Sequence, residues 1–179
     1  MEIELEVKVL GMNTVELEKK VIALGGQLIG EENQVNTLID SKDKPIKSYL
    51  DAYVRIRETK DLMNNNSIST LTLKNNISPG NIKANEEFNV NIENKDVMLN
   101  IFKHLGFDDV KVGYKHRKSY WLENVKLEFD IWDKKTYSYP YMEIEVKNSR
   151  DLDKIITMLN IPQENISTKS IDELMKINE

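Results

Sequence analysis

The sequence predicts an α+β fold in which an antiparallel sheet closes into an eight-stranded β-barrel, a tunnel with a charged lumen and flanking helices. Eight segments alternate between apolar and polar or charged residues with the period of two that is typical of a strand. The segments between them place apolar residues at helical spacing, with cap residues before them and glycines after two of them. Many strands with few helices indicate the α+β class.

The expected strands follow from this alternation. They span residues 2–10, 27–41, 53–58, 69–74, 86–92, 112–122, 126–133 and 141–147. Four helices are expected after the cap candidates Asn13, Asn94, Ser149 and Ser170, and Ser170 has Glu173 three residues on, as in a capping box. A short helix is also expected within residues 45–52.

Two of these strands carry nearly the same charged pattern. The segment ELEVK, from Glu4 to Lys8, returns as EIEVK from Glu143 to Lys147. Because side chains alternate along a strand, the acidic and basic residues of each segment share one face, and its apolar residues share the other. An ordinary solvated sheet face is the simplest interpretation of one such strand. The charge patterns of the other strands argue against this interpretation.

Most of the other strands also place two like charges on one face, as in Arg55-x-Arg57, Lys115-x-Arg117 and Glu128-x-Asp130. Such a pair sets two charged groups about 7 Å apart along the strand, where they repel one another. The pattern is sensible if carboxylates chelate cations and the basic residues grip a multiply charged anion.

A closed barrel brings these faces together. With the apolar faces outward under the helices, the lumen becomes a polar tunnel without open sheet edges, and its acidic and basic groups compensate each other. A carrier of apolar ligands would need an apolar lumen, so the pattern disfavours that class of protein.

Composition narrows the chemistry. The chain has 179 residues, no Cys and two His, which excludes thiolate sites and disfavours His-rich metal sites. Any metal should then be a hard cation held by carboxylates, Mg²⁺ or Mn²⁺ before zinc. The net charge of −5 argues against nonspecific nucleic-acid binding. We expect a single domain over residues 1–179, a cytoplasmic location and no membrane partner, because no apolar run is long enough to span a bilayer.

The charged motifs, taken in order, resemble the CYTH family, also known as the triphosphate tunnel metalloenzymes. They are Glu4-x-Glu6-x-Lys8, Arg55-x-Arg57, Lys74 at the end of TLK, Glu87, Lys115-x-Arg117, Asp130, Glu143-x-Glu145 and Lys169-Ser170. The family includes class IV adenylyl cyclases, thiamine triphosphatases and inorganic tripolyphosphatases. The resemblance covers nearly the whole chain.

The resemblance implies roles for individual residues. The implied ligands of Mg²⁺ or Mn²⁺ are Glu4, Glu6, Glu143 and Glu145, with Asp130 as a further acidic candidate. The implied triphosphate-binding residues are Lys8, Arg55, Arg57, Lys74, Lys115 and Arg117. Glu87 is expected to orient a basic neighbour, and Lys169 to neutralise or protonate the departing phosphate.

We therefore predict a metal-dependent phosphohydrolase that acts on a small-molecule triphosphate, inorganic or organic. The alternatives are a class IV adenylyl cyclase, which converts ATP to cyclic AMP and pyrophosphate, and a noncatalytic polyphosphate-binding module. Three departures from the family pattern, Asn89, the segment 134–141 and Ile171, leave the choice of substrate open. The oligomeric state is also open, with a homodimer as one alternative. No GxxxxGK loop is present, so a Walker-type nucleotide site is excluded.

Overall fold

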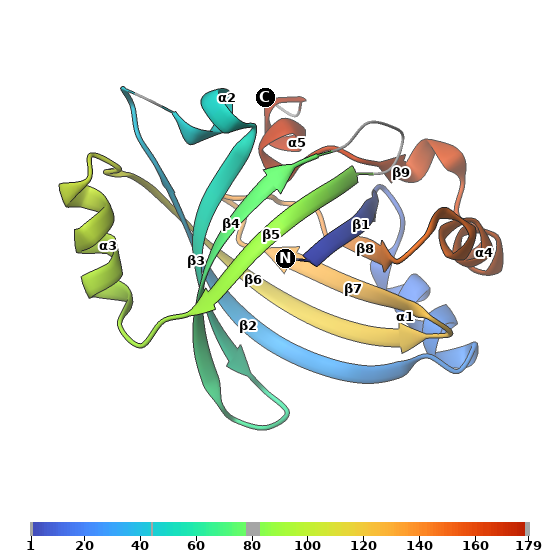
Figure 1. The fold of residues 1–179 in the computed structure, drawn as a ribbon. Helices are drawn as coiled ribbons and strands as arrows, with labels where there is room; N and C mark the ends of the chain where they lie inside the picture. Colours follow the sequence, from blue (N-terminus) through green and yellow to red (C-terminus); the bar gives the residue numbers. More distant parts are fainter. Residues whose placement is uncertain (1, 44, 78–82, 178–179) are drawn as a thin grey trace.

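The structure, a computed structural model, describes residues 2–43, 45–77 and 83–177, without the side chains of residues 2–4, 83, 84 and 177. Within this part of the chain, nine strands form one sheet (Figure 1). They are β1 (Glu2–Val9), β2 (Gln27–Asp40), β3 (Ala52–Asp61), β4 (Ser67–Asn76), β5 (Lys83–Asn91), β6 (Asp109–Leu122), β7 (Val125–Trp132), β8 (Tyr141–Val146) and β9 (Ile166–Ser167). The eight expected strands are present, and β9 is a short addition.

Every expected helix is confirmed, including the short one within residues 45–52. The helices are α1 (Thr14–Ala23), α2 (Ile46–Leu50), α3 (Lys95–His104), α4 (Ser149–Leu159), the 3₁₀ turn η1 (Gln163–Asn165) and α5 (Ile171–Ile177). Asn13 caps α1 and Asn94 caps α3 through their side-chain oxygens. The cap of α4 is Asn148, one residue before the expected Ser149.

The strand order is β5-β4-β3-β2-β6-β7-β8-β1-β9, and every pair is antiparallel. An additional pairing joins β1 to β5, with Glu2 opposite Glu87 and Glu6 opposite Lys83. The predicted α+β class and antiparallel sheet are therefore confirmed.

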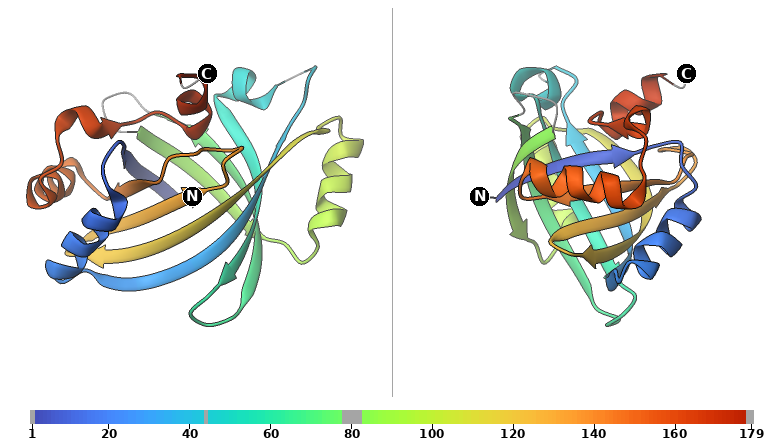
Figure 2. Two further views of the ribbon diagram at one scale, coloured as in Figure 1. Left: turned by 180° about the vertical axis from the view of Figure 1, so that it is seen from behind. Right: turned by 90° about the vertical axis from the view of Figure 1, so that its right-hand side faces the viewer.

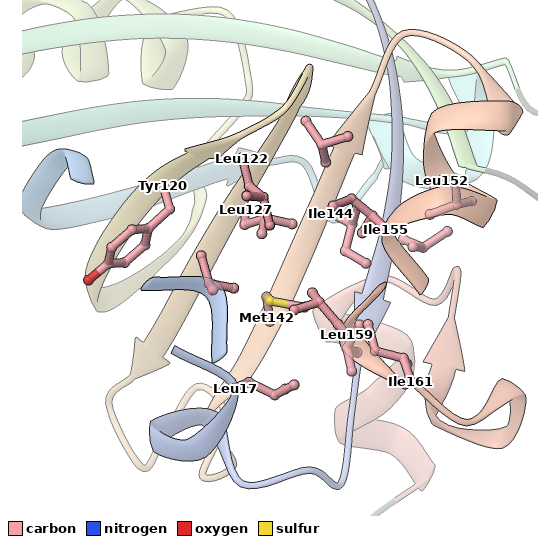
Figure 3. Close-up of a cluster of buried hydrophobic side chains, with 14 of the residues drawn as sticks. Leu17, Tyr120, Leu122, Leu127, Met142, Ile144, Leu152, Ile155, Leu159 and Ile161 are labelled. Carbon is pink, nitrogen blue, oxygen red and sulfur yellow. The ribbon is translucent and has the colours of Figure 1, made fainter. Parts of the chain in front are cut away.

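One cluster of apolar side chains lies between the sheet and two helices. In Figure 3, Leu17 of α1 and Ile155 and Leu159 of α4 point toward Met142 and Ile144 of β8. All five of these side chains are almost completely buried. The apolar alternation of β8 is thus explained by the helices that cover this face of the sheet.

A second apolar cluster lies under α3, where Met98, Leu99 and Phe102 pack against residues of β2, β3 and β4. Figures 1 and 2 place α3 at the opposite end of the molecule from α1 and α4. A third cluster holds α5, through Leu174, against Tyr137 and Tyr141. No helix in the described residues has the length and apolar character needed to cross a membrane.

The other face of the sheet is lined by ionisable side chains that are nonetheless buried. Seven charged residues of this face are at most 8% exposed. They are Lys8, Lys74, Glu87, Lys115, Arg117, Glu128 and Asp130. Lys, Arg, Asp and Glu are rarely buried to this extent unless they are paired, so this face requires a chemical explanation.

Candidate functional site

The charged face encloses a cavity of about 480 Å³ to which each of the strands β1–β8 contributes. Ten of the predicted site residues line it. They are Glu6, Lys8, Arg55, Arg57, Lys74, Glu87, Lys115, Arg117, Glu143 and Glu145. A more open groove of about 950 Å³ includes one predicted site residue, Lys115, and is therefore not the predicted site. The alternation read from the sequence thus brings these ten side chains together.

The remaining three predicted residues are not part of the described cavity lining. Asp130 is buried directly behind the lining, where it contacts Lys115 and Arg117. Lys169 is exposed and lies outside the cavity lining, although the next residue, Ser170, belongs to it. The side chain of Glu4 lies outside the described residues.

Arg117 is the centre of the densest charge cluster. Its Nε donates to Asp130 Oδ1 and its Nη2 to Asp130 Oδ2, both at 2.6 Å. Nη2 also donates to Glu143 Oε2 at 2.8 Å, and Nη1 pairs with Glu128. Burial alone would lower the pKa of Arg117, but Asp130 and Glu128 outweigh it and raise this pKa above its usual range.

Lys115 lies beside this cluster, with Nζ 2.9 Å from Asp130 Oδ2 and 5.1 Å from the centre of the Trp132 ring. The Tyr141 hydroxyl accepts from Trp132 Nε1 at 2.9 Å and donates to Asp130 Oδ2 at 3.1 Å. Burial, reinforced by Arg117, lowers the pKa of Lys115 to about 8 despite the attraction of Asp130. Both Asp130 oxygens therefore accept from neighbouring side chains, and this carboxylate anchors the basic groups.

Lys8 and Lys74 are held by carboxylates of the neighbouring strands. Lys8 Nζ is 3.0 Å from Glu143 Oε1, and Lys74 Nζ is 2.6 Å from Glu87 Oε1. Glu6 lies between them, 3.9 Å from Lys8 Nζ and 3.5 Å from Lys74 Nζ. Glu87 thus has the contact expected of a residue that orients a basic neighbour.

The same contacts explain two opposite pKa shifts. Burial disfavours the charged form of both Lys8 and Glu143. Their mutual attraction reverses this effect, with Glu6 adding to it at Lys8 and Arg117 at Glu143. The pKa of Lys8 is therefore raised and that of Glu143 falls well below its usual range.

Arg55 and Arg57 stand apart, because neither forms a salt bridge with an acidic residue of the described chain. Arg57 Nε donates to Asn36 Oδ1 at 3.1 Å, and the buried Nε of Arg55 has no hydrogen-bond partner in this part of the structure. Burial, together with the charges of Arg55 and Arg117, lowers the pKa of Arg57 to about 10. The two guanidinium groups therefore lack an anionic partner among the described residues.

The predicted metal ligands were tested against their contacts. Glu6 and Glu145 are opposite one another on β1 and β8, and Glu143 is opposite Lys8. Carboxylate oxygens are the donors that Mg²⁺ and Mn²⁺ prefer, so the chemistry of this set fits the expected cation. Glu6, Glu143 and Glu145 are each paired with a Lys or Arg, and the described residues contain no cluster of three acidic or His side chains arranged to hold a metal.

Several residues of the site were not among the predicted metal-binding, triphosphate-binding or catalytic residues. Glu128 and Lys126 lie on the face of β7 that Asp130 also occupies, so the alternation of that strand was a usable signal. On β8, Tyr141 shares the alternation of Glu143 and Glu145, whereas Asn36 gave no such signal. Their places depend on the registers of β2 with β3 and of β7 with β8, which place Asn36 opposite Arg57 and Tyr141 opposite Asp130.

This geometry agrees with a comparison against protein families. The model of the CYTH domain matches residues 2–171. The chain belongs to the CYTH family. The matched region contains each of the strands β1–β9.

Solved structures share this CYTH fold. The PH1012 protein from Pyrococcus horikoshii OT3 is 25% identical over 96% of this chain and 98% of its own, with a TM-score of 0.77. A candidate adenylate cyclase from Vibrio parahaemolyticus is 14% identical over 98% of both chains, with a TM-score of 0.71.

The candidate adenylyl cyclase HpAC1 from Hippeastrum, described as having a dominant triphosphatase activity, is 17% identical over 100% of this chain and 97% of its own, with a TM-score of 0.67. A comparison with curated proteins finds no significant match.

Proposed function

We propose that this CYTH protein is a divalent-metal-dependent phosphohydrolase that binds a triphosphate in a closed tunnel formed by β1–β8. The observation that carries the proposal is the pair Arg55 and Arg57, two guanidinium groups that line the cavity without an acidic partner in the described residues. The pairing of β1 with β5 supports a closed tunnel, because β5 begins the strand order and β1 lies near its end.

The other four predicted basic residues of the cavity, Lys8, Lys74, Lys115 and Arg117, are each paired with a carboxylate. Within the predicted set, a triphosphate would therefore meet uncompensated charge at Arg55 and Arg57. Lys8, Lys74, Lys115 and Arg117 would add hydrogen bonds while their carboxylates fix their positions. This arrangement suits a transition state whose charge spreads over several phosphate oxygens.

Mg²⁺ or Mn²⁺ would be held by Glu4, Glu6, Glu143 and Glu145, the carboxylates implied by the family pattern. When bound, the cation supplies charge neutralisation at the phosphate oxygens. The positive charges of Lys8 and Arg117 also lie against Glu143 and hold the pKa of this carboxyl well below its usual range.

In the proposed reaction, water attacks a phosphorus atom and the bond to the bridging oxygen on the opposite side breaks. The departing phosphate gains negative charge, and the attacking water releases its proton to the surrounding water. Lys115 and Arg117, aligned by Asp130, are placed to stabilise charge on the phosphate oxygens. Lys169 is proposed to meet the departing group at the end of the cavity near Ser170.

A cyclase reaction would use the same cavity and replace water by the 3′-hydroxyl of ATP. The shared fold of the Vibrio parahaemolyticus protein, a candidate adenylate cyclase, supports this alternative. The activity described for HpAC1 supports triphosphate hydrolysis by the same fold. A third alternative is binding without turnover.

One experiment separates the three alternatives. The protein is incubated with Mg²⁺ or Mn²⁺ and, separately, with tripolyphosphate, ATP and thiamine triphosphate, and the products are identified by chromatography. Orthophosphate supports the proposal, and cyclic AMP with pyrophosphate supports the cyclase. Tight binding without any product would leave a polyphosphate-binding module and overturn the phosphohydrolase.

A further inference from the structure

We propose that the end of the cavity beneath α5 is a subsite for an apolar or planar organic group, so that the substrate is an organic triphosphate rather than inorganic tripolyphosphate. This inference rests on the proposed function, since it names the substrate class of the same cavity.

The lining of the cavity also contains apolar and aromatic side chains. They are Leu38 of β2, Tyr53 of β3, Trp132 of β7 and Ile171 and Met175 of α5, and these five form the apolar part of the lining. The charged Lys47, Asp172 and Glu173 line the cavity beside them. The total volume of about 480 Å³ is within the range of pockets that hold small organic ligands, about 300 to 1,000 Å³.

Two rings of the apolar part lie in contact with basic groups of the cavity. The Cζ atom of Arg55 lies 5.6 Å from the centre of the Tyr53 ring, and Lys115 Nζ lies 5.1 Å from the centre of the Trp132 ring. A ligand whose phosphates reach Arg55 and Lys115 would therefore place an attached group beside these two rings. The geometry fits a triphosphate with an organic group at one end.

The α5 wall is built into the fold. Ile171 and Met175 pack with Trp132 in the apolar cluster around Leu174, which is 6% exposed. The Ser170 backbone nitrogen and hydroxyl donate to Glu173 Oε2 at 2.6 and 2.8 Å, which confirms the predicted capping box.

Helix α5 also contacts the opposite side of the cavity. Lys47 of α2 pairs with Asp172 of α5, Nζ to Oδ2 at 3.1 Å, and both residues line the cavity (Figure 1). The apolar wall is thus held from both sides.

Inorganic tripolyphosphate has no use for such a wall. Its oxygens gain from cations and water, and contact with Met175 or Tyr53 would remove water without supplying a hydrogen bond. An aromatic or apolar group gains free energy from the same contact, in proportion to the apolar area that it buries. The two kinds of substrate therefore predict different effects of truncating the wall.

The test compares two ligands whose triphosphates are both esterified once, ATP and methyl triphosphate. Isothermal titration calorimetry in metal-free buffer gives their dissociation constants. We expect ATP to bind at least about tenfold more tightly, since its organic group fills the apolar part of the cavity. Equal or tighter binding of methyl triphosphate would overturn the inference.

Variants locate the effect. The double variant Ile171→Ala and Met175→Ala should weaken ATP binding about tenfold and leave methyl triphosphate within twofold. The volume-conserving Met175→Leu should retain ATP binding. Met158→Ala is the matched control, because Met158 of α4 is equally half-buried but packs in the cluster under α1 and α4, outside the cavity. Circular dichroism verifies that each variant is folded.

The two proposals fail in different ways. If the double variant weakens both ligands alike, the subsite is wrong, even where wild-type protein hydrolyses a triphosphate. If the dissociation constants of the two ligands differ as expected but no condition gives turnover, the subsite remains as a binding site. The proposal of a phosphohydrolase is then wrong. Failure of both ligands to bind overturns the subsite, whereas the phosphohydrolase is overturned only if no triphosphate is hydrolysed in the presence of Mg²⁺ or Mn²⁺.

Discussion

Arg117 and Asp130 form a bidentate ion pair in the interior of the sheet, with two N–O distances of 2.6 Å. The Arg117 side chain is 8% exposed and that of Asp130 is fully buried. Charged groups in such a place require partners with good geometry, because removing them from water costs several kcal/mol each. The pair therefore fixes the direction of the guanidinium that the cavity presents to its ligand.

The first prediction concerns this pair. Asp130→Asn removes the negative charge that faces Arg117 and Lys115, so like charges are left together in the interior. We expect the free energy of unfolding to fall by about 3 kcal/mol, as is typical when one partner of a buried pair is removed. Urea denaturation at pH 7 measures this change. Glu123→Gln is the control, since its pair with Lys154 is about half exposed and should contribute less than about 1 kcal/mol.

The second prediction concerns Arg55 and Arg57, which lack acidic partners in the described residues. Arg55→Met and Arg57→Met should each leave the protein as stable as the wild type or more stable, because one of two neighbouring positive charges is removed. Each should weaken triphosphate binding by about 1.5 to 3 kcal/mol, the contribution of a hydrogen bond to a charged group. Calorimetry measures the affinity and urea denaturation the stability. Unchanged affinity in both variants would show that the anion lies elsewhere.

The sequence was sufficient to place these residues on one face. Alternation predicted that Arg55, Arg57, Lys115 and Arg117 point away from the apolar core, and the structure confirms it. The cap residues and glycines located the helices for the same reason, because each acts on its own segment. Local rules therefore determined most of the fold.

The partners of the charges were not predictable in this way. That Arg117 faces Asp130, and that Tyr141 reaches the same carboxylate, depends on the registers of β6 with β7 and of β7 with β8. Registers arise from the packing of whole strands, and the amphipathic pattern of one strand does not reveal them. The family resemblance implied Asp130 as a further acidic candidate for the metal, and the structure adds its contacts with Lys115, Arg117 and Tyr141.

The third prediction concerns pH. Lys115 in the free protein has its pKa lowered to about 8 by burial and by Arg117, so its ammonium group loses its proton as pH rises beyond this value. A bound triphosphate favours the charged form and raises this pKa. Binding is therefore coupled to proton uptake above pH 8, and affinity should fall there by up to about tenfold per pH unit. Calorimetry with tripolyphosphate between pH 7 and 9.5, in metal-free buffer, measures the slope. Lys115→Met should flatten it, and an equal slope in that variant would contradict the assignment.

The fourth prediction concerns the metal. Glu145→Gln should abolish most of the turnover in Mg²⁺ or Mn²⁺, because it removes a proposed ligand. Stability should change by less than about 1 kcal/mol, since the pair of Glu145 with Lys126 is about 30% exposed on each side. Glu18→Gln is a suitable control. Glu18 pairs with Lys118 at 3.0 Å but lies outside the cavity, so its loss should leave turnover unchanged. Full turnover of the wild type in excess EDTA would refute the metal requirement.

The last prediction concerns Lys169, the residue just before the capping box of α5. Its backbone nitrogen donates to Ser167 Oγ at 3.2 Å, and the capping box fixes the next residue, so its main chain is held on both sides. The side chain is exposed, outside the lining of the cavity. The proposed function requires this long side chain to turn toward the departing phosphate once a ligand is bound.

If Lys169 acts in this way, its charge matters most when the leaving group gains negative charge. Lys169→Ala should then lower kcat more than it raises KM, because the interaction is stronger in the transition state than in the ground state. Lys176→Ala is the matched control. Lys176 is an exposed Lys in the last turn of α5, and it lies outside the cavity. Steady-state kinetics with the preferred triphosphate measure both constants. A rise in KM alone would assign Lys169 to ground-state binding, and wild-type kinetics would show that it is an exposed residue of the segment before α5 with no part in the reaction.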